Sequence, residues 1–274
     1  MYRPVILLAL LILVALTSRA DETRSVSMRP VPPETGYEVV YRATVPGKSG
    51  ISETYTVHAV KLEHEGRAYY QSISDYPDRT RWVTMDAKDL TPVAVVEKEK
   101  GDGGLIKRIY DDGSVYMLRR GVHHPWDFTV DVPAGVHDPE TFAFLLKGYP
   151  FEEQDTMSPI SVLFTEPIPL YSSLFDRPLT FDVLIIPHGT EKVAVPAGEF
   201  ECYVLEMTVA GPLRYIVPKN RFWLLKEYPH MIVRAEGAGE TIELVGGPFK
   251  CDGNEHCITG ANKEGIGREV GRQD

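Results

Sequence analysis

Cysteine, positive charge and long apolar runs are all scarce in this 274-residue chain. It has 29 basic side chains against 39 acidic ones, a formal net charge of −10. That balance argues against binding nucleic acid or anionic lipid headgroups through bulk charge. Beyond the first residues, no apolar run approaches the ~20 residues that a helix needs to span a bilayer. No internal repeat of fixed period is present.

Two common catalytic motifs are also missing. The glycine-rich stretch Gly101–Gly104 separates two expected strands and does not open a helix, so it lacks the context of a phosphate-binding loop. Ser172 and Ser173 have no Gly-x-Ser-x-Gly elbow around them. Neither feature supports a catalytic assignment, and we expect no cofactor.

The N-terminus has the pattern of a cleavable export signal over residues 1–20. Arg3 supplies a positive charge, Val5–Leu16 is an unbroken apolar run, and Ser18 and Ala20 are small residues before the expected cleavage site. The run is too short to span a bilayer. Arg19 is unusual so near a cleavage site and leaves a retained anchor as the alternative. We expect a periplasmic or secreted protein.

The chain has three cysteines, and two of them enclose a short polar loop near the C-terminus. In an exported protein, the spacing of Cys251 and Cys257 favours a local disulfide. A metal site that includes His256 is the alternative, but it would lack a fourth ligand and a rigid frame. Cys202 falls in an expected strand, where we expect a small buried hydrophobe.

Alternation of apolar and polar residues predicts strands along most of the chain. Turn sequences separate the runs at short intervals, which favours an antiparallel meander. The segment 199–210 is the most regular: it places Cys202, Val204, Glu206 and Thr208 on the face opposite to its aromatic and aliphatic residues, as in a half-buried strand. The expected strands are Tyr37–Val45, Ser52–Leu62, Arg67–Asp75, Thr80–Asp86, Val93–Lys100, Leu105–Asp111, Ser114–Arg119, Leu179–Pro187, Glu191–Val195, Glu199–Ala210, Arg221–Glu227, Met231–Ala235 and Glu240–Val245.

One short amphipathic helix interrupts this pattern. Asp138 is a good N-cap, Pro139 suits the first helical position, and Gly148 suits the position just past the end. We expect its apolar stripe to pack on the sheet. The stripe consists of Phe142, Leu145 and Leu146.

We expect a single antiparallel β domain over residues 36–246. It would lie between a flexible lead-in, residues 21–35, and a polar tail, residues 247–274, that contains the cysteine loop. The proline-rich segment 150–178 is less regular. There we expect a short strand or turn at Ser161–Phe164 and otherwise a long, mobile loop.

Four segments, in this order along the chain, resemble landmarks of an exported bacterial family that is catalogued as a domain of unknown function (the DUF 3108 type). The resemblance as a whole extends over roughly residues 37–245. One departure is Lys147 after the helix, where the family tends to have arginine, because lysine cannot make the same bidentate contact. The segments are Thr84–Lys100, Gly135–Phe151, Lys192–Met207 and Arg221–Gly237.

The resemblance implies a curved antiparallel sheet around one helix, a half-barrel similar to the lipoprotein carriers LolA and LolB. The family has no established activity, so it implies no catalytic residues. Aromatic residues on alternating strand positions, such as Tyr41 and Tyr55, are typical of ordinary core. A curved sheet with only one short helix, however, leaves part of its concave face unfilled and available to an apolar ligand.

These observations lead to the hypothesis of an exported, non-enzymatic protein whose concave apolar sheet binds a lipid-like ligand or a lipoprotein acyl chain. The periodicity of the strand and of the helix predicts which side chains lie on the apolar face. That these side chains line a binding groove is a hypothesis. The expected ligand-binding residues are Phe142, Leu146, Tyr203, Leu205, Met207 and Val209.

Two alternatives remain open. The first is an envelope scaffold that presents a sheet edge or the loop 150–178 to partner proteins. The second is a metal-dependent hydrolase. Adjacent histidines in an extended segment point to opposite faces, so only one of the pair would face a metal, and solvated loop histidines are the simpler interpretation. The candidate metal ligands of such a hydrolase are His123, His124, Asp127 and His137.

Overall fold

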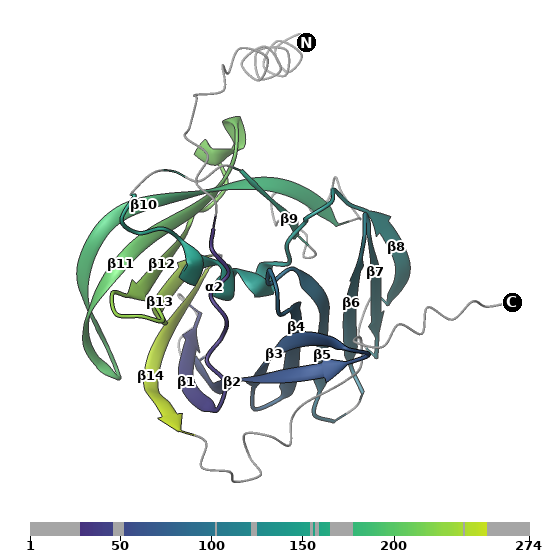
Figure 1. Cartoon of the computed structure of the whole chain (residues 1–274), viewed down its shortest axis with the longest axis horizontal. Helices are drawn as coiled ribbons and strands as arrows, with labels where there is room; N and C mark the ends of the chain where they lie inside the picture. Colours follow the sequence, from purple (N-terminus) through teal and green to yellow (C-terminus); the bar gives the residue numbers. More distant parts are fainter. Residues whose placement is uncertain are drawn as a thin grey trace, which may run out of the picture.

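One antiparallel sheet of fourteen strands makes up nearly all of the computed structural model, which describes residues 28–45, 52–101, 103–121, 125–153, 156, 159–164, 178–237 and 239–250. Two meanders, β1–β8 and β9–β14, are joined where β1 pairs with β14 (Figure 1). The strands are β1 (Tyr37–Thr44), β2 (Ser52–His64), β3 (Arg67–Asp75), β4 (Arg79–Asp86), β5 (Pro92–Glu99), β6 (Leu105–Asp111), β7 (Ser114–Arg120), β8 (Trp126–Asp131), β9 (Ile160–Phe164), β10 (Leu179–Val195), β11 (Gly198–Val209), β12 (Asn220–Leu225), β13 (Ile232–Gly237) and β14 (Glu240–Lys250).

The structure confirms the expected all-β class and most expected strands, with two differences. The segments 179–187 and 191–195 form one strand, β10, which continues through a register shift between Pro187 and Thr190. Strand β8 was not predicted, although Trp126, Phe128 and Val130 alternate along it and lie in one apolar cluster.

The sheet ends at strands β8 and β9 and is not closed by pairing between them. A parallel bridge joins His137, which follows β8, to Val162 of β9. The neighbouring side chain, Leu163, packs against Val115 and Met117 of β7. Strand β9 is therefore buried on two sides by different parts of the chain.

The expected helix is present as three short helical turns: η1 (Pro139–Thr141), α2 (Phe142–Leu145) and η2 (Leu146–Gly148). We call residues 139–148 the helical segment. Asp138 caps it as predicted, because its carboxylate accepts a hydrogen bond from the Glu140 amide at 2.8 Å. Gly148 is the last helical residue and does not lie beyond the end as we expected.

A buried ion pair fixes the start of the helical segment to the sheet. The fully buried Asp138 carboxylate accepts hydrogen bonds from Arg108 of β6, at 2.7 and 3.2 Å, and from the Tyr110 hydroxyl. Burial raises the pKa of Tyr110 well above its ordinary value, so the hydroxyl remains a donor. Asp138 therefore both caps the helical segment and holds it on β6.

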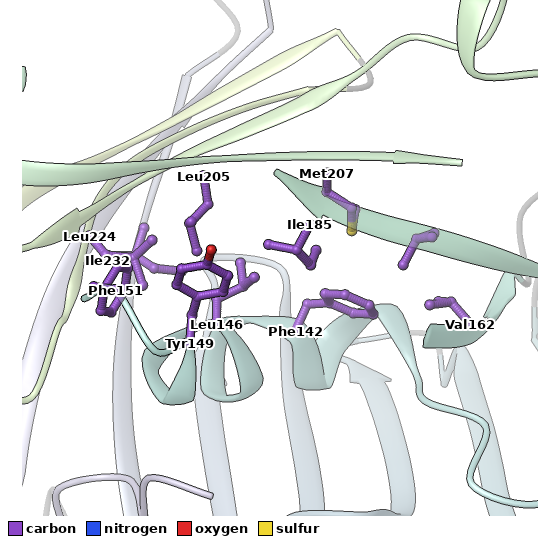
Figure 2. Packing of buried hydrophobic residues seen from close by; sticks show 11 residues of the cluster. Phe142, Leu146, Tyr149, Phe151, Val162, Ile185, Leu205, Met207, Leu224 and Ile232 are labelled. Carbon is purple, nitrogen blue, oxygen red and sulfur yellow. The ribbon is translucent and has the colours of Figure 1, made fainter. Parts of the chain in front are cut away.

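The main core lies between the helical segment and the inner face of the second meander (Figure 2). Phe142 and Leu146 pack there against Leu205 and Met207, which confirms the predicted face of strand β11 and two of the three residues of the helix stripe. Leu145 is buried but is not part of this core. Tyr203 is partly buried and stacks on Phe151, with ring centroids 4.1 Å apart. Val209 is also buried.

The prediction that the strand at 199–210 is half-buried was wrong, since β11 is buried on both faces. Cys202 and Val204 pack with Trp223 on the second face, and Cys202 is a free buried thiol. Glu206 on that face is 6% exposed and forms an ion pair with Lys219 at 2.7 Å. Period-two alternation did not reveal this second cluster, because its other members come from β10, β12 and β13.

Part of the expected flexible lead-in lies against the fold instead. Met28 packs against the main core, and the Arg29 amide donates a hydrogen bond to the Gly148 carbonyl at 3.0 Å. Thr35 bridges to Ala59 of β2. Met28, Arg29 and Thr35 thus contact the domain that we expected to begin at residue 36.

Several predictions lie outside the described residues. They concern the export signal, the expected disulfide between Cys251 and Cys257, the pair His123 and His124, and most of the loop 150–178. Within the part of the chain that the structure describes, no helix is long and apolar enough to cross a bilayer.

Candidate functional site

A cavity of about 500 Å³ lies between the helical segment and the inner face of strands β1–β4 and β12–β14. This volume is within the range of small-molecule sites, which are mostly apolar with a few placed polar groups. The wall has that character, because aliphatic and aromatic side chains from both meanders and the helical segment contribute to it. Its larger apolar residues include Val39, Val57, Val83, Phe142, Phe144, Phe164, Met207, Phe222, Met231, Ile232 and Ile242.

Of the six expected ligand-binding residues, Phe142 and Met207 line the cavity. Leu146 and Leu205 are fully buried in the main core, and Tyr203 and Val209 are also not among the lining residues. The helical segment fills the inner face of the second meander, so the open space is displaced toward the first. The predicted apolar face therefore lies next to the cavity, and only Phe142 and Met207 of that face line the cavity.

Sequence reasoning missed the wall that β1–β4 contribute. A row of aromatic residues crosses these strands: the rings of Tyr41 and Tyr55 lie 5.8 Å apart, and Tyr55 stacks on Tyr76 at 4.4 Å. Arg79 extends the row, with its guanidinium carbon 3.9 Å from the Tyr76 ring centroid. The alternating positions of these aromatic residues in the sequence could have indicated the wall. The same alternation, however, is found in residues that fill a core and in residues that line a cavity.

The tyrosines of this row remain protonated near neutral pH. Burial raises the pKa of Tyr41 and of Tyr55. The Tyr41 hydroxyl donates a hydrogen bond to the Ile232 carbonyl of β13 at 3.0 Å. The bond ties the first strand to the second meander across the cavity wall.

The two arginines in the wall are neutralised by carboxylates. Arg79 donates two hydrogen bonds to Glu53, both at 3.2 Å. Arg81 pairs with Glu97 and with Glu140 of η1, each with an N–O distance of 2.6 Å. The Arg81–Glu140 pair fastens the first turn of the helical segment to β4, and all these pairs together leave little positive charge for a ligand.

Lys147 is different from these arginines. It is half-buried and lines the cavity, and its ammonium lies 5.5 Å from the centroid of the Phe144 ring. Within the described residues it has no ion-pair partner. Burial lowers the pKa of Lys147 to about 8, against the opposing effect of Glu34. Among the described residues, the site therefore contains one cation without an ion-pair partner, in largely apolar surroundings.

The structure does not assemble the expected metal ligands from the residues it describes. Asp127 accepts a hydrogen bond from Tyr116 at 2.9 Å and pairs with Arg120 at 3.3 Å. Burial lowers the pKa of His137, and its Nδ1 has no hydrogen-bond partner among the described residues. Among the described residues, no group of three or more His, Cys, Asp and Glu side chains is arranged to hold a metal ion.

Comparison with known proteins identifies no relative: no family model, curated protein or solved structure matches this chain. The resemblance of its four segments to the exported family stays a prediction. The function is therefore argued from the cavity.

Proposed function

We propose that this chain is an exported, non-enzymatic protein that binds a lipid-like ligand or a lipoprotein acyl chain in the cavity under the helical segment. The observation that carries this proposal is the cavity itself, about 500 Å³ in volume with a largely apolar wall. Burial of apolar ligand surface contributes roughly 25 cal/mol per Å², so a hydrocarbon chain is the natural occupant of such a wall.

The proposal also includes the location of the protein and the shape of its sheet. The export signal in residues 1–20 supports the periplasm or secretion. The fourteen-stranded sheet around one short helical segment supports a half-barrel of the LolA and LolB kind, and a disulfide between Cys251 and Cys257 would suit an oxidising compartment. The fold likeness by itself implies no function.

The test has two steps. The ligand that co-purifies with the protein is identified, and its binding is then blocked by a substitution that fills the cavity. Organic extracts of the purified mature protein are analysed by mass spectrometry, and displacement of a fluorescent fatty-acid probe measures affinity. We expect Val57→Trp, which fills the cavity, to weaken probe binding at least tenfold. The matched control is Val60→Trp on the opposite face of the same strand.

Two results would contradict the proposal. One is a mature protein that neither carries an extractable ligand nor binds the probe. The other is equal probe affinity in Val57→Trp and Val60→Trp, provided that both variants fold. In either case the cavity would not be a binding site for apolar ligands.

A second candidate function, an envelope scaffold, is favoured by a different observation. Tyr215 and Tyr228 are 77% and 70% exposed, and Ile216 is 55% exposed. Exposed aromatic residues are enriched at protein interfaces. Crosslinking of intact cells is expected to give a specific protein partner that is lost in Tyr215→Ser, with ligand binding unchanged.

A further inference from the structure

The cations in the cavity wall differ in how they are compensated. Arg79 and Arg81 are each held by more than one carboxylate. Burial lowers the pKa of His58, so its ring is neutral at pH 7. Lys147 is the remaining cation, and among the described residues no carboxylate forms an ion pair with it.

The surroundings of Lys147 are apolar where they face the cavity. It extends from the last turn of the helical segment, beside Phe144 and Ala143, and both of these residues also line the space. Glu34 lies on the same wall but forms no ion pair with Lys147. Holding an unpaired charge in such a place costs stability, which is expected where the charge meets a ligand.

We propose that Lys147 binds the anionic headgroup of an amphiphile, a carboxylate or a phosphate at the end of an acyl chain, whose hydrocarbon part occupies the cavity. This inference rests on the proposed function. A charge-assisted hydrogen bond in apolar surroundings is stronger than one in water, because the local dielectric is lower.

The positions of the charged groups give the bound ligand a direction. Lys147 is at the end of the helical segment, and the Arg81–Glu140 pair is at its start. Seven residues separate the two, or about 10–14 Å at the rise of α- and 3₁₀-helices. The stretch between them is lined by Phe142, Ala143 and Phe144. We expect the hydrocarbon to run from Lys147 along this stretch toward the neutralised end.

The test compares three ligands of equal chain length: hexadecanoate, hexadecyl phosphate and hexadecanol. Their dissociation constants are measured at pH 7 by probe displacement on the mature protein. Lys147→Met removes the charge at similar volume, and Lys147→Arg keeps it. Lys61→Met, an exposed lysine on β2, is the matched control.

We expect at least one anion to bind the wild type roughly tenfold to hundredfold more tightly than the alcohol. That preference should disappear in Lys147→Met with alcohol affinity unchanged, and persist in Lys147→Arg and Lys61→Met. The ratio of carboxylate to phosphate affinity identifies the headgroup.

Other outcomes overturn the inference in distinguishable ways. If the wild type binds alcohol and anions equally, or if the preference survives in Lys147→Met, Lys147 is not the headgroup site, while the proposed function stands. If none of the three ligands binds, both proposals fail together.

Discussion

The inner faces of the two meanders differ in how completely they are filled. In the second, β9–β14, Ile185, Leu205 and Leu224 are fully buried under the helical segment. In the first, Tyr41 and Val57 remain only partly buried and line a cavity. One short helical segment thus completes a core on one side and forms the roof of an open space on the other.

The two inner faces also differ in composition. Apolar side chains of the second meander interlock with Phe142 and Leu146 without leaving polar groups to satisfy. The first meander instead contributes the polar residues Ser72, Ser74 and Arg81 to the cavity wall, and Arg81 is paired with carboxylates. Over the first meander the helical segment packs locally, through Phe144 against Val83 and Met85 and through the Arg81–Glu140 pair, and Phe144 and Val83 also line the cavity.

The largest loss of stability is expected when the ion pair between Asp138 and Arg108, which anchors the helical segment to β6, is removed. Asp138→Ala removes the N-cap and leaves Arg108 buried without its carboxylate, so we expect a loss of about 3–5 kcal/mol in the free energy of unfolding. Urea denaturation measures it, with the exposed Asp131→Ala as control. A loss below ~1 kcal/mol would mean that the segment is held by its apolar face alone.

A pair of truncations compares the two inner faces directly. Leu205→Ala opens a hole in the filled side and is expected to destabilise by about 2–5 kcal/mol. Val57→Ala only enlarges an existing cavity, so its cost should stay below ~1.5 kcal/mol. Equal losses in thermal or urea unfolding would show that the two faces are packed alike.

Gly148→Ala tests the contact between the helical segment and residues 28–31. A Cβ at this position would lie 1.8 Å from the Arg29 carbonyl oxygen, so one of the two backbones must move. We expect a destabilisation of about 1–3 kcal/mol and faster proteolysis near Arg29. Unchanged proteolysis would indicate that residues 28–31 are not held by this contact.

The smallest expected change in the free energy of unfolding is a gain in stability and not a loss. The pKa of Lys147 falls from its ordinary 10.5 to about 8 on folding, so its protonated form favours the unfolded state below pH 8. Lys147→Met should therefore stabilise the ligand-free protein at pH 7, by about 1–2 kcal/mol once partial solvent screening is allowed for. The gain should shrink as the pH rises from 8 to 10.5, because wild-type lysine then becomes neutral. Unfolding at pH 7 and at pH 10 checks this, and a pH-independent difference would contradict it.

Local pattern predicted most of the fold. Alternation located the strands, and Asp138 with Pro139 located the start of the helical segment, because both signals depend on neighbouring residues only. The second buried face of β11 was not predictable in this way, since its packing partners come from three other strands.

The candidate site was predicted less well, for the same reason. Leu146 and Lys147 are neighbours, yet one is fully buried in the core and the other faces the cavity. Which of them meets a ligand depends on how the segment docks through Asp138 and Gly148. Periodicity identified the apolar stripe but not the side of the sheet that the stripe would fill.

The pairing of β1 with β14 makes completion of the sheet a late event in the life of the chain. The Tyr41–Ile232 hydrogen bond spans 191 residues, and contacts of such separation slow folding. A chain that is still being synthesised lacks β14, so β1 and β13 remain additional unpaired edges. The cavity wall, which needs both meanders, therefore forms only when the last strand has been delivered.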